Sequence, residues 1–253
     1  MSDKEPSQQE PADVEHNQLP MHKPGYEPIG SVLLWILALY IPTFLLSLAF
    51  GIYAQANPNI IDINRWFYDG DVTAVFAIGM AMVTLPVLAR ATKELNHQQK
   101  LNFYGLGKSA SFNEFKPWFI ITVVYIFLSF LVNALFEVKT PEWMNDLLAS
   151  TDNIWLSVLS LCIVAPIFEE LVFRGFIYKK IEQTVLRKSG AVFFTALLFT
   201  LIHTQYEAII LFDLFVLAMI LSIVRLKTDN LKYCIAIHML NNMVSAYLLY
   251  SGT

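Results

Sequence analysis

The chain has 253 residues, of which 56% are hydrophobic and only 15% are charged. This composition indicates a membrane protein with several spanning segments and excludes an ordinary soluble domain. The net charge of −4 gives no sign of a nucleic-acid partner. Cys162 and Cys234 both fall in apolar segments. They are therefore predicted to be small buried residues rather than a disulfide framework or a zinc-type cysteine cluster.

Residues 1–30 are polar, acidic and rich in proline, and no apolar run follows a short basic start. This pattern predicts a disordered tail rather than a cleaved signal peptide. The membrane domain is predicted to occupy residues 31–253.

Seven apolar segments follow the tail, and most have the length that a helix needs to cross about 30 Å of hydrocarbon. They predict an all-α, polytopic membrane bundle of about seven transmembrane helices. The expected spans are 31–54, 71–89, 117–136, 154–178, 191–204, 207–226 and 232–250. The fifth span is short and the sixth begins almost at once, so a tight turn is expected at 204–207. The connection at 137–153 has the apolar residues of a short amphipathic piece on the outer face.

The basic residues set the orientation of this bundle. If the N-terminus is cytoplasmic, fourteen of the 17 Lys and Arg residues lie in cytoplasmic loops, whereas only Arg65 and Lys139 lie in outer loops. The remaining one, Arg174, lies inside the fourth span. Cytoplasmic loops of membrane proteins carry an excess of Lys and Arg. The count therefore predicts a cytoplasmic N-terminus and an outer C-terminus.

The fourth span contains an acidic pair and an arginine, Glu169, Glu170 and Arg174, in apolar and aromatic surroundings. Each charge in a membrane span costs about 2.5–3.5 kcal/mol on insertion scales. Three charges within six residues therefore indicate a functional site. Glu170 and Arg174 are four residues apart and share a helix face. Glu169 is rotated by about 100° from Glu170. We therefore assign Glu170 and Arg174 as a structural pair and Glu169 as the working base; the alternative is a helix-end salt bridge at the membrane surface.

Two further spans carry polar side chains at the same spacing. Phe199 and His203 are four residues apart in the fifth span, and His238 and Asn242 are four apart in the seventh. Each pair shares a helix face. A lone histidine in a membrane is more often a helix–helix hydrogen-bond donor than a catalyst. Because polar groups in hydrocarbon need partners, two histidines and the Glu pair on three helices favour one shared site.

These groups suit the hydrolysis of a carbonyl bond. Glu169 can take a proton from water and deliver it to the leaving amine. His238 and Asn242 can donate hydrogen bonds to the developing oxyanion, and His203 can hold the attacking water. Alternatively, His203, His238 and Glu169 match a two-His, one-carboxylate site for a divalent metal such as zinc, which would activate the water. The sequence leaves the cofactor open.

Three motifs occur in order on three apolar segments: Glu-Glu-x-x-x-Arg at 169–174, Phe-x-x-x-His at 199–203 and His-x-x-x-Asn at 238–242. Together they resemble the CPBP family, the CAAX-protease and bacteriocin-processing intramembrane proteases, also called the Abi family. The resemblance covers about residues 115–250, where it implies an all-helical catalytic core. It does not extend to the first two helices or the tail.

The resemblance implies an intramembrane endopeptidase that lies in the lipid bilayer and acts on membrane-associated proteins or peptides. It implies the bacterial cytoplasmic (inner) membrane as the location. Family members in eukaryotes remove the last three residues of prenylated CAAX proteins, a specificity that we do not carry over. Metal-dependent and metal-free mechanisms both stay open. The catalytic residues implied are Glu169, His203, His238 and Asn242, with Glu170, Arg174 and Phe199 in support.

Two other functions fit the same residues. One is a non-catalytic membrane scaffold or bacteriocin self-immunity protein, in which the polar groups bind a peptide or hold the bundle together. The other is a transporter that uses Glu, His and Asp213 as a proton relay. Asp213 is otherwise a packing carboxyl. Glu207, four residues after His203, either orients that imidazole or is an ordinary turn residue.

The predicted topology leaves one geometric difficulty. It places His203 near the outer end of the fifth helix and His238 near the inner end of the seventh. A shared site therefore requires the fifth helix to begin later or to break near His203, or the turn at 204–207 to lie within the membrane.

Overall fold

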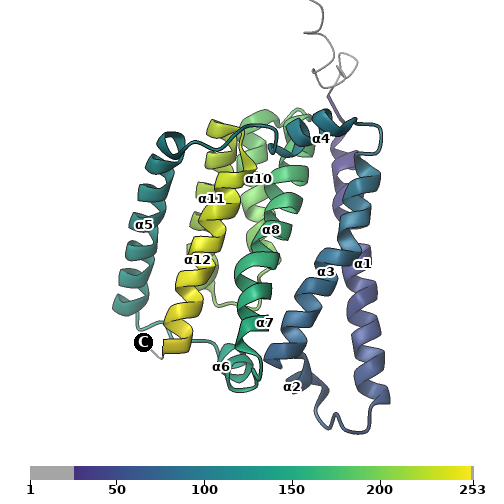
Figure 1. The fold of residues 1–253 in the computed structure, drawn as a ribbon, viewed down its shortest axis with the longest axis vertical. Coiled ribbons are helices and arrows are strands. Elements are labelled where there is room, and N and C mark those ends of the chain that lie inside the picture. Colours follow the sequence, from purple (N-terminus) through teal and green to yellow (C-terminus); the bar gives the residue numbers. More distant parts are fainter. Residues whose placement is uncertain (1–25, 252–253) are drawn as a thin grey trace, which may run out of the picture.

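The computed structural model describes residues 26–251, which form helices joined by short connections, with no strand among them (Figure 1). The predicted all-α class is confirmed. The predicted tail lies outside the described residues up to position 25. The helices are α1 (Ile29–Ala56), α2 (Ile63–Phe67), α3 (Gly70–Ala91), α4 (His97–Tyr104), α5 (Phe112–Leu135), α6 (Glu142–Ala149), α7 (Ile154–Leu159), η2 (Ser160–Val164), α8 (Ala165–Glu170), η3 (Leu171–Ile177), α9 (Tyr178–Glu182), α10 (Arg187–Leu201), α11 (Ala208–Thr228) and α12 (Leu231–Ser251).

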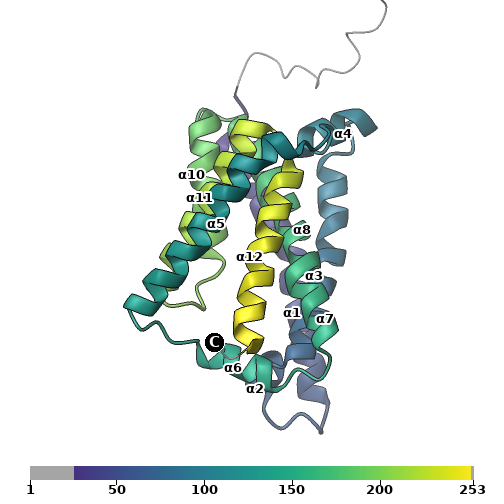
Figure 2. The same ribbon diagram turned by 60° about the vertical axis from the view of Figure 1, so that its left-hand side comes forward.

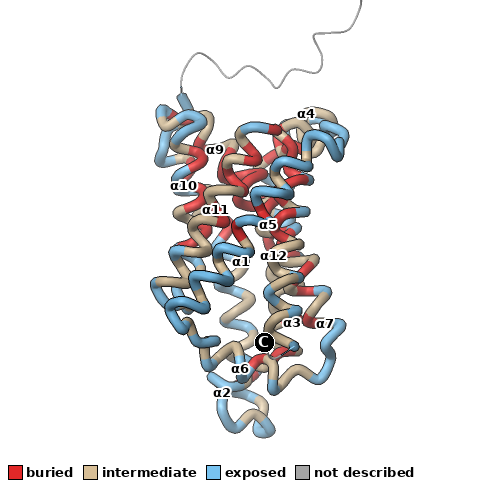
Figure 3. Tube along the Cα trace, turned by 90° about the vertical axis from the view of Figure 1, so that its left-hand side faces the viewer, coloured by how far each residue is buried: buried red, intermediate tan, exposed pale blue. Residues whose placement is uncertain are grey.

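The long helices lie side by side as an elongated bundle (Figures 1 and 2). The continuous helix from α7 to α9 runs through the middle and packs against α3, α10 and α12. α1 pairs with α3 on one edge, and α5 rests on α11 and α12 at the other. Buried residues gather toward the end that holds α4, α9 and the start of α10 (Figure 3). The protein core is therefore concentrated in one half of the bundle.

Within residues 26–251, five helical stretches are long and apolar enough to cross a membrane: α1, α3, α5, the stretch from α7 to α9, and α11. These correspond to five of the seven predicted spans. The other two predicted spans are also helical, as α10 and α12, but they are not among the five. α10 has only 15 residues, so it is about 22 Å long. An integral membrane bundle is thus supported, whereas seven crossings and the orientation stay predictions.

The helix of residues 154–182 contains two π-helical segments, η2 and η3, on either side of α8. A π-helix bonds residues i and i+5, and such turns occur often at functional sites. Here they enclose the six-residue α8, which carries Glu169 and Glu170. The acidic pair therefore lies on a short α-helix, and the π-helical turns before and after it determine the direction in which its side chains point.

α10 ends at Leu201, two residues before His203, and α11 begins at Ala208. The amide of His203 donates to the carbonyl of Thr200, and the amide of Tyr206 donates to the carbonyl of His203. In Figures 1 and 2 this turn ends above the lower ends of α12 and α7. The fifth helix thus breaks near His203, which is one of the solutions that the sequence required for a shared site.

Two short helices, α6 and α4, lie at opposite ends of the bundle and are each bonded to neighbouring elements there. α6 is the short piece expected at 137–153, and Ser150 after it accepts a hydrogen bond from the amide of Gly70 at the start of α3. At the opposite end, the buried Arg225 of α11 donates to the carbonyls of Arg174 and Phe103. Gly105, which follows α4, has φ +72°, and its Cα faces the guanidinium of Arg225. Arg225 therefore joins α4 and α11 to the helix that carries the acidic pair.

Candidate active site

Glu170 lies at the centre of a buried polar cluster. Its side chain has no exposed surface, and its Oε1 accepts from Arg174 Nη1 at 2.9 Å and from His238 Nδ1 at 2.9 Å. Hydrogen bonds between charged groups are stronger than neutral ones. The predicted pairing of Glu170 with Arg174 is present, and it also reaches a histidine on α12.

Arg174 uses its remaining donors on α11. Its Nη2 donates to the carbonyl of Ala218 at 2.9 Å, and its Nε donates to the hydroxyl of Ser222 at 3.4 Å. The guanidinium lies over the ring of Phe199 at 4.6 Å. A buried charge needs such partners on every side. Arg174 thus links α11 and α10 to the acidic pair.

The contact with Glu170 fixes the proton of His238. A carboxylate paired with arginine can only accept, so Nδ1 of His238 carries the hydrogen. Its Nε2 then points to Glu169, with Oε2 at 3.7 Å. The Glu169 side chain is 17% exposed, whereas that of Glu170 is fully buried. The two carboxylates therefore differ as the sequence predicts, since one is locked in the protein and the other retains access.

His203 is oriented by the backbone of its own chain segment. Its Nδ1 lies 2.8 Å from the carbonyl oxygen of Phe199, which can only accept, so Nδ1 carries the hydrogen. Nε2 is then left to accept from water or to bind another ligand. Glu207 is exposed and makes no side-chain cap bond at the start of α11. The partner of this imidazole is therefore a carbonyl, and the structure supports the turn-residue alternative for Glu207.

Phe199 holds the two imidazoles and the arginine together. Its ring centroid lies 4.9 Å from that of His203 and 5.7 Å from that of His238. Phe173 packs on it edge-on at 5.2 Å, and the residue is 1% exposed. Rigid aromatic packing of this kind fixes ring positions. The spacing Phe-x-x-x-His thus has a physical role, because one ring positions the histidine on its own segment and the histidine of α12.

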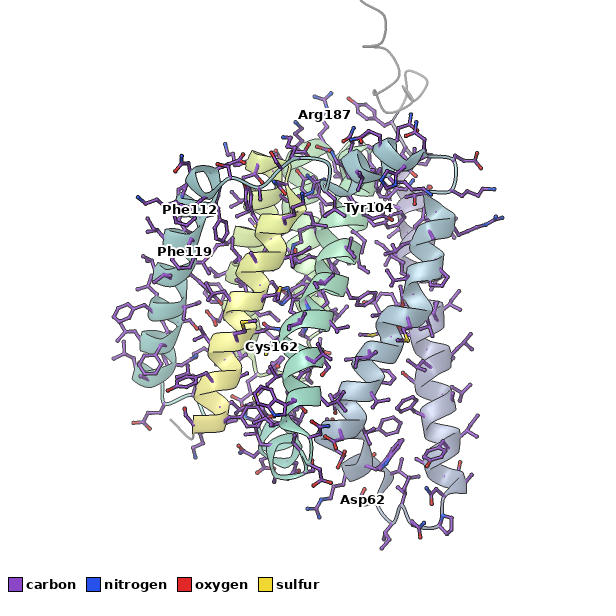
Figure 4. The ribbon with its side chains drawn as sticks, in the orientation of Figure 1. Asp62, Tyr104, Phe112, Phe119, Cys162 and Arg187 are labelled. Carbon is purple, nitrogen blue, oxygen red and sulfur yellow. The ribbon has the colours of Figure 1, made fainter. Side chains whose placement is uncertain are left out.

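Asn242 lies one turn beyond His238 on α12. Its Nδ2 donates to the carbonyl of Leu161 at 2.9 Å, and its Oδ1 accepts from Asn241 at 3.4 Å. The thiol of Cys162, labelled in Figure 4, donates to the carbonyl of Asn242 at 3.6 Å. Asn242 is therefore on the same helix as His238, but its contacts are with η2 rather than with Glu169.

The sequence also allowed a metal bound by His203, His238 and Glu169. Within residues 26–251, no three His, Cys, Asp or Glu side chains are grouped so that they can hold a metal ion. His203, His238 and Glu169 therefore do not form that ligand set in this structure.

Asp213, an acidic residue of the sixth predicted span, lies apart from these contacts. Its carboxylate accepts from the hydroxyl of Ser129 at 2.7 Å, and its carbonyl accepts from the hydroxyl of Tyr125 at 3.2 Å. Both partners belong to α5. Asp213 therefore joins α5 to α11, as the packing alternative predicts.

Two aromatic residues that the sequence analysis did not select lie beside the cluster. Tyr206 packs on the imidazole of His203 with ring centroids 6.3 Å apart, and Trp143 of α6 packs edge-on against Tyr206 at 5.3 Å. Burial raises the pKa of Tyr206 to about 12, and the charge of Glu169 contributes to the rise. The one available signal was an aromatic residue in the turn three positions after His203.

The structure thus brings six of the predicted residues into one connected set and places the seventh, Asn242, one helical turn away. The connections run from Glu169 through His238 to Glu170, Arg174, Phe199 and His203. Four separate elements supply them: α8, η3, α10 with its following turn, and α12.

Comparison with known proteins gives matches in the same region. Residues 151–244 match the family described as type II CAAX prenyl endopeptidase Rce1-like. The uncharacterized 24.3 kDa protein of Escherichia coli is 30% identical over 130 residues, which cover 49% of this chain and 59% of that protein. UPF0177 protein YbdI of Lactococcus lactis subsp. lactis (strain IL1403) is 36% identical over 81 residues, covering 32% of this chain and 42% of that protein.

The matched regions thus span less than two thirds of both curated relatives, and no solved structure matches the chain. The family match includes all three motifs, from Glu169 to Asn242. It confirms, over residues 151–244, the similarity to the CAAX-protease family that these motifs indicate.

Proposed function

We propose that this chain is an intramembrane endopeptidase that hydrolyses peptide bonds of membrane-associated proteins or peptides. The observation that carries the proposal is the contact set around Phe199. Both imidazoles lie on its ring with their Nδ1 hydrogens already used, and the partly exposed Glu169 faces the Nε2 of one of them. The Rce1-like match over residues 151–244 supports the same class of reaction.

In the proposed mechanism Glu169 is the general base. It takes a proton from a water molecule that the free Nε2 of His203 holds, and it later passes this proton to the leaving amine. His238, oriented by Glu170 through Nδ1, places its Nε2 beside Glu169 at the reacting bond. Asn242, one helical turn beyond His238, donates its second amide hydrogen to the developing oxyanion.

Glu170, Arg174 and Phe199 act through the other residues. Glu170 orients His238 and leaves Nε2 directed at Glu169. Arg174 compensates the charge of Glu170 and so prevents two uncompensated carboxylates from lying side by side. Phe199 sets the separation of the two imidazoles. Such supporting contacts determine whether catalytic groups stay within a fraction of an ångström of the productive geometry.

We further propose that the protein lies in the bacterial cytoplasmic membrane with its N-terminus inside, because fourteen of its basic residues then lie on the cytoplasmic side of the bundle. Single cysteines introduced at Lys139 and Lys188 test this orientation in a chain without Cys162 and Cys234. A membrane-impermeant thiol reagent applied to spheroplasts should label position 139 and not position 188. The reverse pattern would contradict the orientation.

The experiment that tests the function compares protein termini in membranes from cells that carry the wild type, Glu169→Gln or Glu94→Gln. Glu94 is a matched control because it lies in an exposed connection near α4. Mass spectrometry should find new termini with the wild type and Glu94→Gln that disappear with Glu169→Gln. Identical termini in all three, at equal expression, would favour a non-catalytic scaffold or immunity protein.

A further inference from the structure

The turn after α10 holds Tyr206 at the edge of the proposed catalytic set. Its amide donates to the carbonyl of His203 at 3.1 Å, and its ring packs on the His203 imidazole with an interplanar angle of 27°. The backbone bond and the ring contact come from the same residue pair. Tyr206 and His203 therefore have a fixed relative position.

A second segment holds Tyr206 from the other side. Trp143 of α6 packs against the Tyr206 ring at 5.3 Å, and Tyr68 packs on Trp143 at 6.1 Å. α6 itself is tied to the start of α3 by the bond between Ser150 and Gly70. The ring of Tyr206 is thus held between His203 of its own turn and Trp143 of α6, without any hydrogen bond to its hydroxyl among the described residues.

The hydroxyl of Tyr206 is a donor at neutral pH, and its ring packs on the imidazole of His203. The carboxylate of Glu169 is the neighbouring charge that, after burial, contributes to the raised pKa of about 12. A phenol with such a pKa keeps its hydrogen under all ordinary assay conditions. The side chain therefore lies beside His203, the residue proposed to hold the water, and carries a hydrogen that no described residue accepts.

The proposed reaction needs a donor of this kind. The Nδ1 hydrogens of both imidazoles are already given to Phe199 and Glu170, so the neutral rings can only accept at Nε2. Asn242 gives one amide hydrogen to Leu161. An oxyanion is normally stabilised by donors that are in place before the charge develops. The residues of the three motifs therefore supply few hydrogen-bond donors for the oxyanion.

We propose that Tyr206 is a further catalytic residue, whose hydroxyl donates a hydrogen bond to the oxyanion of the tetrahedral intermediate. Glu169 removes a proton from water, the water oxygen bonds to the scissile carbon, and the carbonyl electron pair moves to its oxygen, which accepts from Tyr206. The pair then returns, the carbon–nitrogen bond breaks, and the amine leaves with the proton from Glu169. Trp143 is a positioning residue that holds Tyr206. This inference rests on the proposed peptidase function.

The test uses a quenched fluorescent peptide built on a terminus that appears with the wild type and not with Glu169→Gln. The full-length chain is purified in detergent as the wild type, Tyr206→Phe and Tyr247→Phe. Tyr247 is a matched control because it lies on α12 and is 73% exposed. Removing one oxyanion donor typically lowers kcat by about 10²–10³-fold. We expect this loss for Tyr206→Phe with an almost unchanged KM, and wild-type kinetics for Tyr247→Phe.

A purely structural role predicts a different result. Tyr206→Phe keeps the ring that packs on His203 and Trp143, so its melting temperature should match the wild type. All variants are assayed below the lowest melting temperature among them, so instability does not hide the result. Trp143→Phe should lower kcat by less than Tyr206→Phe, because it retains the hydroxyl. A kcat for Tyr206→Phe within threefold of the wild type, with Glu169→Gln inactive, would overturn this inference alone.

The failure of the proposed function gives a separate result. If the wild type and Glu169→Gln produce the same termini, no peptidase activity depends on the base, and the role of Tyr206 falls with it. If Tyr206→Phe raises KM and leaves kcat unchanged, the hydroxyl contributes to substrate binding equally in the ground state and the transition state, and the oxyanion role is overturned.

Discussion

The buried carboxylate of Glu170 leads to a prediction about stability that its partly exposed neighbour Glu169 does not share. Glu170→Gln keeps the shape of the side chain and one acceptor, but it removes the negative charge that faces Arg174 at 2.9 Å and His238 at 2.9 Å. Both Glu170 and Arg174 have fully buried side chains. The substitution therefore leaves a cation in the interior without its counter-charge.

The magnitude follows from that burial. Removing one partner of a buried ion pair costs about 3–5 kcal/mol. The amide oxygen of glutamine can still accept from Arg174 or His238, so we expect a loss near the lower limit, about 3 kcal/mol. This corresponds to a change of about 100-fold in the unfolding equilibrium, since about 1.4 kcal/mol is tenfold.

The assay is reversible unfolding in mixed micelles by titration with sodium dodecyl sulfate, followed by circular dichroism. Glu169→Gln is the matched control, because Glu169 is adjacent, partly exposed and 3.7 Å from its nearest charged partner. It should change the free energy of unfolding by less than about 1 kcal/mol. The double variant Glu170→Gln/Arg174→Met should lose less free energy of unfolding than the sum of the losses of the two single variants. The difference should be about 0.5–3 kcal/mol. Equal stability of Glu169→Gln and Glu170→Gln would refute this reasoning.

Three further outcomes can be measured independently. Gly105→Ala should lower the melting temperature, because the residue has φ +72° and an added Cβ would lie 2.7 Å from Arg225 Cζ. The left-handed conformation alone costs about 1–2 kcal/mol. Gly51→Ala is the control and should not destabilise, because the space around Gly51 is open. Phe199→Leu should fold but lose at least about tenfold in cleavage rate, because both imidazoles lose the ring that positions them; unaltered cleavage would contradict that role. Asp213→Asn should leave terminal cleavage unchanged, since it keeps an acceptor for the serine of α5; lost cleavage would place Asp213 in the site.

Hydropathy and spacing predicted the helices better than their ends. α5 begins at Phe112, five residues before the predicted start, because Pro117 is accommodated within the helix and the polar residues of its first turns remain exposed. The two π-helical segments were not predicted, since their wider turns leave no periodic signal in so short a stretch. The break at Leu201 was needed by the site geometry rather than indicated by composition.

Among the contacts of the site, those within one helix could be predicted from the sequence, whereas those between distant segments could not. The i,i+4 spacing predicted the contact of Glu170 with Arg174, because both partners lie on one helix. The bond from His238 to Glu170 joins positions 68 residues apart, and sequence spacing does not encode such a contact. Trp143 and Tyr206 were missed for the same reason. The catalytic assignment of Glu169, His203, His238 and Asn242 remains a proposal that the experiments above test.

The partnership of Glu170 and Arg174 within one helix has a consequence for membrane insertion. Two isolated charges would oppose the entry of the 154–182 segment into the bilayer. Because the pair is four residues apart on the same helix, it can form while that segment is still alone, before α11 and α12 are present. The segment then enters the lipid with these two charges mutually neutralised. Ala218, Ser222 and His238 complete the hydrogen bonds only when the later helices pack against it.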